Sequence, residues 1–164
     1  MVKIGLLSDT HGYWDDRYAQ YFVDCDEIWH AGDIGSINLA DRLAENKILR
    51  AVHGNIDGHL ERLKYPKDLF FECEQHRILL THIGGYPGKY AYEIQPALME
   101  YKPTIFVCGH SHIAKVKYDQ KLGLLHLNPG AAGNFGFHAI RTLMRFEIEG
   151  KDIRNLEVIE LGTR

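Results

Sequence analysis

The chain has 164 residues, of which 45% are hydrophobic and 25% are charged, so it can form a globular core of ordinary domain size. Its net charge of −3 argues against broad electrostatic binding to nucleic acid or to an anionic membrane. The three cysteines are widely spaced and match no disulfide framework, which predicts a reduced, cytoplasmic protein with buried thiols.

The first third of the chain alternates apolar runs with helical segments. Three runs are predicted as buried strands, over residues 2–7, 27–31 and 48–52. Helices are predicted over residues 15–24 and 37–46, and Ser36 is suited to cap the second of them. This alternation predicts parallel strands joined by helical crossovers.

The second half of the chain contains more strands. Residues 70–74 and 77–81 predict a hairpin, and a short helix is predicted over residues 96–101, which begin with a proline. Further strands are predicted over residues 104–108, 115–118, 122–127, 140–148 and 153–161. We predict an α/β protein with a single domain over residues 1–164, in which two packed sheets carry helices outside.

Polar residues follow five of the predicted strands. These residues are Asp9, Asp33, Asn55, His82 and His110. Because ligand sites gather at the carboxyl ends of strands in open α/β sheets, we expect these side chains to meet at one edge. Alternate residues of an extended segment point the same way, so Asp9 and His11 are predicted to reach one ion. A turn between His110 and His112 would direct their imidazoles to different ions.

Two of the motifs pair a glycine with an oxygen ligand. In Gly32-Asp33, the glycine allows close backbone approach, and the carboxylate has two oxygens that can bridge two cations. In Gly54-Asn55, the asparagine offers a neutral amide oxygen, and Asp57 follows as a candidate acceptor behind it. Each motif alone is more often a turn or a surface pair than a metal site. Their occurrence in order, each after a strand, is what indicates a metal centre.

The order of the motifs D-x-H, G-D, G-N-x-D, H and G-H-x-H resembles that of the calcineurin-like metallophosphoesterases. The compact length and residues 8–12, 30–34 and 128–130 are similar to the small bacterial and archaeal phosphodiesterase branch, whose fold the retromer subunit Vps29 shares. The resemblance implies a four-layer α/β/β/α sandwich of two mixed sheets flanked by helices.

The resemblance also implies a dinuclear metal centre. The ligands of one ion would be Asp9, His11 and His112. The ligands of the other would be Asn55, His82 and His110. Asp33 would bridge both ions. Because the set contains carboxylate, amide and imidazole groups without thiolate, it suits two divalent ions chosen from manganese, iron, cobalt, nickel and zinc.

The implied function is a metal-dependent phosphoric ester hydrolase, in which a metal-bridging hydroxide attacks phosphorus in line. Asp33, Asn55 and His110 would form the catalytic set. Asn55 and His30 would contact the substrate. The alternative for His30 is a buried strand histidine bonded to the backbone.

One position departs from the wider superfamily. Many members have a histidine after the asparagine, proposed to assist the leaving group, and Ile56 occupies that position here. This departure predicts weak activity on phosphomonoesters with basic leaving groups and better activity on small phosphodiesters. His138 and His53 are candidates to replace the missing acid.

Glycine-rich loops are predicted to surround the centre. Residues 84–89 depart from the nucleotide-binding P-loop pattern and are expected at the rim, with Tyr86 and Lys89 near the substrate. Residues 128–137 are expected to form another wall of the site.

Two other functions compete with the small phosphodiesterase. A Vps29-like protein-binding scaffold without catalysis is the main alternative, and the complete set of ligand positions argues against it. A nuclease is disfavoured by the negative charge and by the length. No membrane partner is expected, since no apolar run reaches the length of a bilayer span and the first residues lack a secretory signal layout. The physiological substrate and the oligomeric state, a homo-oligomer included, stay open.

Overall fold

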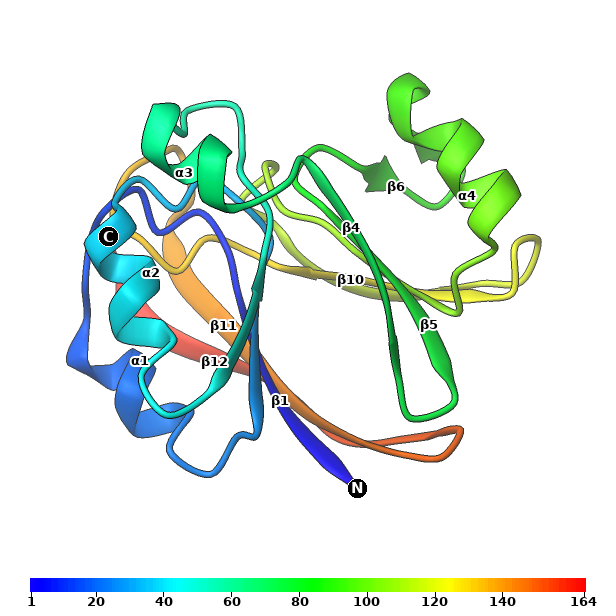
Figure 1. The fold of residues 1–164 in the computed structure, drawn as a ribbon, viewed down its shortest axis with the longest axis horizontal. Helices are drawn as coiled ribbons and strands as arrows, with labels where there is room; N and C mark the ends of the chain where they lie inside the picture. The colour runs from blue at the N-terminus through cyan, green and yellow to red at the C-terminus, as the bar shows by residue number, and fades with distance from the viewer.

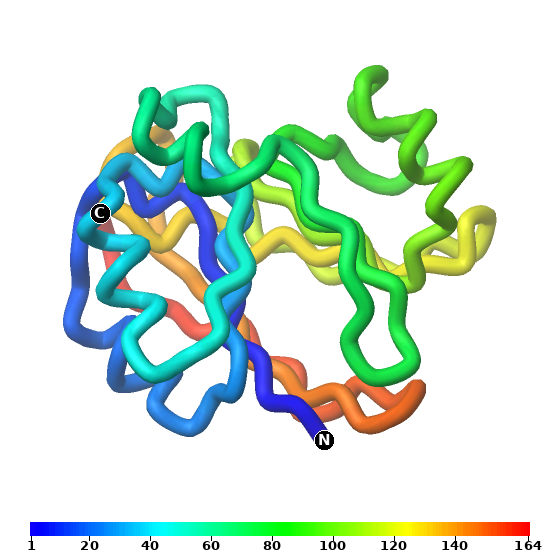
Figure 2. Tube along the Cα trace, in the orientation of Figure 1, coloured from blue at the N-terminus to red at the C-terminus, as the bar shows by residue number.

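The computed structural model describes all 164 residues, and its first layer of strands is a mixed five-stranded sheet (Figure 1). The strand order is β12-β11-β1-β2-β3. Three strands run parallel, namely β1 (Val2–Leu7), β2 (Glu27–His30) and β3 (Ile48–Ala51). The hairpin of β11 (Ile140–Glu149) and β12 (Asp152–Thr163) pairs antiparallel with β1, so both chain ends share this sheet (Figure 2).

The second sheet also has five strands, in the order β4-β5-β8-β10-β9. Its members are β4 (Asp68–Cys73), β5 (His76–Thr81), β8 (Ile105–Val107), β9 (Ala114–Asp119) and β10 (Leu124–Pro129). The strands β5, β8 and β10 run parallel, whereas β4 and β9 pair antiparallel at the two edges. The predicted hairpin of residues 70–74 and 77–81 is therefore confirmed, with slightly longer strands.

Helices cover the outer faces of both sheets. Helix α1 (Asp16–Tyr21) and helix α2 (Ile37–Leu43) lie beside the first sheet, and α4 (Gln95–Tyr101) lies beside the second (Figure 1). The Ser36 side chain accepts a hydrogen bond from the Leu39 N–H, which confirms the predicted cap of α2. Helix α1 is shorter than the predicted 15–24, since Phe22 already leaves the helical conformation.

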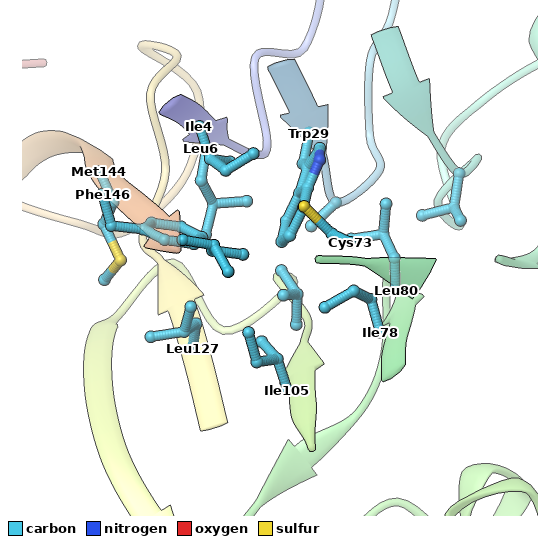
Figure 3. Packing of buried hydrophobic residues seen from close by; sticks show 14 residues of the cluster. Ile4, Leu6, Trp29, Cys73, Ile78, Leu80, Ile105, Leu127, Met144 and Phe146 are labelled. Atoms are coloured by element: carbon cyan, nitrogen blue, oxygen red, sulfur yellow. The ribbon is translucent and has the colours of Figure 1, made fainter. Parts of the chain in front are cut away.

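Three hydrophobic clusters separate the four layers. The central cluster fills the space between the sheets, and Figure 3 shows Leu6, Trp29 and Met144 of the first sheet facing Leu80 and Leu127 of the second. A second cluster joins the first sheet to α1 and α2, and a third joins the second sheet to α4. Burying one such aliphatic side chain contributes about 1.5–3 kcal/mol, so these clusters hold the layers together. The predicted α/β/β/α sandwich is confirmed.

Several short elements were absent from the prediction. They are α3 (His59–Lys64), the small hairpin of β6 (Gly85–Tyr86) and β7 (Lys89–Tyr90), and the 3-10 helix η1 (Tyr92–Ile94). Helix α3 has only six residues, too few for a periodicity to be detected, and in the structure it exposes Leu60 and Leu63 and buries only Glu61.

The cysteines confirm the prediction of buried thiols. Cys25, Cys73 and Cys108 are all free and buried. Cys108 lies in the cluster behind β8, and burial raises the pKa of its thiol to about 12. None of the helices combines the length and the apolar character needed to cross a bilayer.

Candidate metal centre

Five of the seven predicted ligands have a left-handed backbone. The φ angles are 55° at Asp9, 47° at His11, 53° at Asp33, 69° at His110 and 62° at His112. This conformation costs a non-glycine residue about 1–3 kcal/mol and concentrates at functional sites, where the surroundings enforce it. The extended geometry predicted for residues 9–11 is therefore wrong, because these residues form a turn.

Hydrogen bonds between loops enforce these conformations. The Asp9 N–H donates to the Gly32 carbonyl at 3.0 Å, and the His11 N–H donates to the Asp33 carbonyl at 3.0 Å. The His110 N–H donates to Asp9 Oδ2 at 3.1 Å. The loops that follow β1, β2 and β8 are thus joined to one another, so the fold itself sets the positions of the side chains.

Two glycines allow the loops to pack this closely. A Cβ atom on Gly32 would lie 2.7 Å from His82 Nδ1, and φ at Gly32 is +98°, where a side chain would be strained. A Cβ atom on Gly54 would collide with the carboxylate of Asp33. The close approach predicted for Gly32 is confirmed, and Gly54 has the same function beside Asp33.

A first group of side chains comprises Asp9, His11 and His112, whose ligand atoms all lie within 4.8 Å of one another. His112 Nε2 is 3.1 Å from Asp9 Oδ1, and His11 Nε2 is 3.8 Å from the same oxygen. Burial favours the neutral acid at Asp9, but the adjacent imidazoles of His11, His112 and His82 together outweigh it and hold the pKa of the carboxyl below its usual range. The group therefore presents an anionic oxygen and two imidazoles.

A second group comprises Asp33, His82 and His110, whose ligand atoms also lie within 4.8 Å of one another. His82 Nε2 is 3.2 Å from Asp33 Oδ2. His82 Nδ1 lies 2.7 Å from the Ala31 carbonyl oxygen. Because a carbonyl can only accept a hydrogen bond, Nδ1 is the donor, and the neutral ring has its lone pair on Nε2. The turn predicted between His110 and His112 is confirmed, since the two imidazoles join different groups.

Asp33 lies between the two groups. Its Oδ2 is 3.2 Å from His82 Nε2 and 3.5 Å from His11 Nε2, so one carboxylate oxygen faces an imidazole of each group. Its Oδ1 accepts a hydrogen bond from the Ile56 N–H at 3.0 Å. This arrangement fixes the carboxylate and leaves Oδ2 directed at both groups.

Two buried nitrogen atoms of these groups lack a partner within the protein. His11 Nε2 and His82 Nε2 are buried and make no hydrogen bond, although carboxylate oxygens lie nearby. A buried polar atom without a partner is costly, and two lone pairs that face each other repel. A cation among these atoms would relieve both penalties. The donors present, carboxylate oxygen and imidazole nitrogen, therefore fit divalent transition metals.

Asn55 lies at the edge of the second group. It is exposed, and it lines a cavity of about 460 Å³ together with His82. Its neighbours Gly54 and Ile56 both contact Asp33. The structure thus brings the loop of Asn55 to the same edge as the other predicted ligands.

Comparisons with known proteins identify the family. The calcineurin-like phosphoesterase superfamily domain matches residues 2–151. The chain belongs to the calcineurin-like phosphoesterase superfamily. A probable metallophosphoesterase of Methanothermobacter thermautotrophicus is 30% identical over 137 residues, covering 79% of this chain and 77% of the relative.

Solved structures share the fold of this superfamily member. Vps29 of Chaetomium thermophilum has a TM-score of 0.77 at 14% identity, covering 100% of both chains. A predicted phosphoesterase of Streptococcus pneumoniae has a TM-score of 0.72 at 23% identity, covering 97% of this chain and 89% of that one. The chain therefore has the fold of the small, Vps29-like proteins.

The environment of His30 differs from that expected of a residue that contacts the substrate. Its side chain is only 1% exposed, and Nδ1 accepts a hydrogen bond from the Gly32 N–H at 3.1 Å. Its Nε2 lies 2.9 Å from the Thr10 hydroxyl, which in turn donates to the Ile34 carbonyl. Burial lowers the pKa of His30 to about 4, so the ring is neutral and both nitrogens are used within the protein. The backbone-bonded alternative is the correct one, and His30 positions the loops.

Asp57 supports the neighbouring loops as an acceptor. Its carboxylate accepts hydrogen bonds from the N–H groups of Gly54 at 2.8 Å, Ile34 at 3.1 Å and Gly35 at 2.8 Å. These contacts join the loop after β3 to the loop after β2. Asp57 therefore acts on backbone groups near the ligands.

The two glycine-rich loops that were expected around the centre differ in where they lie relative to it. Phe135 lies with its ring centroid 5.1 Å from that of His11, so the expected wall of residues 128–137 is present. Tyr86 instead lies under the Lys115 Nζ, which is 4.4 Å from the ring centroid. Neither Tyr86 nor Lys89 lines the cavity beside Asn55.

His138 contacts a predicted ligand, which sequence reasoning missed. His138 Nε2 lies 2.9 Å from the Gly133 carbonyl, so this nitrogen carries the proton and Nδ1 accepts. His112 Nδ1 lies 3.1 Å from His138 Nδ1 and must then be the donor. These two hydrogen bonds leave the lone pair of a neutral His112 ring on Nε2, the nitrogen that faces Asp9. His138 therefore positions His112 and is not free to act as the replacement acid.

His138→Ala is expected to weaken metal binding at the first group by about 10–100-fold, because a partner that fixes a ligand's tautomer contributes that much affinity. Calorimetric titration of Mn²⁺ into the metal-free protein measures this change. His59→Ala is the matched control, since His59 is exposed on α3. Equal affinities in the two variants would contradict the positioning role.

Proposed function

We propose that the protein is a dinuclear-metal-dependent phosphodiesterase. The observation that carries this proposal is the position of Asp33 Oδ2, which lies 3.2 Å from His82 Nε2 and 3.5 Å from His11 Nε2. One carboxylate oxygen that faces imidazoles of two adjacent groups can bridge two ions. Membership of the calcineurin-like phosphoesterase superfamily supports the same reaction class.

The proposed ligand division follows the two groups. Asp9, His11 and His112 would hold one ion. Asn55, His82 and His110 would hold the other. Asp33 would contribute to both. The ions are a pair of divalent metals, for which manganese, iron, cobalt, nickel and zinc all accept this donor set.

The protein's own residues prepare the centre for an anionic substrate. Two bound divalent ions supply an acidified water and neutralise charge on the phosphate. Asp9 and Asp33 stay ionised, since neighbouring histidines hold the pKa of each carboxyl low against the opposing effect of burial. Asn55 and His110 are both exposed, so a bound phosphate could contact them directly. We propose that attack on phosphorus is in line and forms no covalent enzyme intermediate.

The residue beside Asn55 favours esters with good leaving groups. Ile56 is 46% exposed at the edge of the centre and has no proton to donate to a leaving group. His138 is committed to His112 and Gly133, so it does not replace that function. Substrates whose leaving group departs as a stable anion need no such acid. We propose on this ground that the preferred diesters are those with good leaving groups, and that monoesters with basic leaving groups react slowly.

A substrate panel with the metal-loaded protein tests the function. Bis(p-nitrophenyl) phosphate is expected to be hydrolysed faster than p-nitrophenyl phosphate, and glycerol phosphate slowest of the three. Metal content measured on the same sample is expected to be two ions per chain. An alkyl monoester as the fastest substrate would refute the diester preference. Two bound metals without hydrolysis of any ester would support a Vps29-like scaffold instead.

A further inference from the structure

A cavity opens directly beside the proposed metal centre. It has a volume of about 460 Å³, and its lining includes Asn55 and His82 of the second group. Cavities of roughly 300–1,000 Å³ hold small organic ligands. A phosphate bound at the centre would therefore have room for one substituent of moderate size in this cavity.

The apolar part of the lining comes from one segment of the chain. Ile83 follows β5, and Ala91, Tyr92 and Ile94 belong to the connection that enters α4. Tyr92 is 87% exposed and Ile83 is 46% exposed, so both keep free apolar surface. An exposed tyrosine ring next to a cavity is a stacking platform for a planar group.

The positive and negative charges of the side chains that line the cavity cancel, and the two cations already have partners within the protein. Lys67 Nζ lies 2.8 Å from Glu93 Oε2. Arg62 donates to the backbone carbonyls of Asp57, Gly54 and Asn55. These cations have partners within the protein, and Asp68 adds a second carboxylate to the lining. The cavity therefore offers no excess positive charge to a second phosphate, and it suits an uncharged substituent.

Free hydrogen-bond acceptors remain in the lining. Asp68 Oδ1 accepts a bond from the Thr81 hydroxyl at 2.6 Å, which leaves Oδ2 available. His53 Nδ1 lies 2.8 Å from the Tyr65 carbonyl, so its Nε2 is the acceptor of the neutral ring. Acceptors of this kind recognise the hydroxyl and N–H groups of a sugar or a base. An alkyl chain would leave them without partners.

We infer that this cavity binds the nucleoside group of a small phosphodiester, with the base stacked on Tyr92 and polar groups directed at Asp68 and His53. The inference rests on the proposed function for the position of the phosphate. A single nucleoside fits the volume of about 460 Å³, and the net charge of −3 disfavours a longer polynucleotide.

Two esters with the same leaving group test the nucleoside site. The metal-loaded protein is assayed with thymidine 5′-(p-nitrophenyl phosphate) and with methyl p-nitrophenyl phosphate. The kcat/KM ratio of the two is expected to favour the nucleoside ester by about tenfold or more, and Tyr92→Ala is expected to lower that ratio about tenfold. Tyr118→Ala is the control, because Tyr118 is an exposed tyrosine of β9 outside the cavity lining.

Binding of thymidine 5′-monophosphate to the metal-loaded protein separates the two proposals. Tyr92→Ala is expected to raise its Kd about tenfold relative to Tyr118→Ala. Tight, Tyr92-dependent binding without hydrolysis of either ester would refute the phosphodiesterase and keep the nucleoside site. Hydrolysis of both esters at equal kcat/KM, with equal behaviour of the two variants, would refute the nucleoside site and keep the phosphodiesterase.

Discussion

Asp33→Asn is expected to lower the kcat for a phosphodiester by about a thousandfold and to reduce the bound metal from two ions to one. Asparagine has the shape of aspartate and can still accept the hydrogen bond from the Ile56 N–H, so the loop is retained. What is lost is the negative charge on the oxygen that faces His11 and His82. A neutral amide is a weak bridging ligand between two dications.

Steady-state hydrolysis of bis(p-nitrophenyl) phosphate, with metal content determined on the same preparation, measures both effects of Asp33→Asn. The matched control is Asp41→Asn, which removes a carboxylate from the exposed face of α2, where Asp41 pairs with Lys64. Full activity and two ions per chain in Asp33→Asn would show that this carboxylate does not bridge.

Removal of each of the two proposed metal ions is expected to lower the free energy of unfolding by about 4 kcal/mol, compared with protein in a thousandfold excess of metal over its Kd. For a chain of this size, the difference corresponds to about 8–16 °C in Tm. The physical reason is that His11 Nε2 and His82 Nε2 are buried without partners beside the ionised Asp9 and Asp33. Bound cations satisfy all four groups.

Thermal unfolding in EDTA and in Mn²⁺ measures this stabilisation. The double variant His82→Ala/His110→Ala is expected to lose about half of the shift, because only the first group then keeps its imidazoles. A wild-type Tm that is the same in EDTA and in Mn²⁺ would contradict a specific metal centre.

The strands were predictable from the sequence because their apolar runs are buried on both faces. Leu6 and Leu7, for example, face the central cluster and the helix-covered cluster respectively, and both are fully buried. Helix α3 was not predictable, because its six residues are too few to show a helical periodicity. The ordered motifs at strand ends also indicated which side chains would gather, since six of the seven predicted ligands lie in the two groups.

Sequence reasoning did not reach the conformations and contacts that depend on several loops at once. The left-handed turn at Asp9 and His11 results from hydrogen bonds to the loop after β2, which no local pattern encodes. The contact between His138 and His112 joins residues 26 positions apart through a glycine-rich loop. The burial of His30 was one of two alternatives that only the packed structure distinguishes.

The left-handed ligand positions have a consequence for the choice of metal. Because loop-to-loop hydrogen bonds fix Asp9, His11 and Asp33, an arriving ion needs no ordering of the backbone. A nitrogen and oxygen donor set follows the general affinity order of divalent metals and does not itself select one of them. The supply of metals in the cell would then determine which ion is bound. We expect protein from manganese-rich and iron-rich cultures to carry different ions in the same unchanged scaffold.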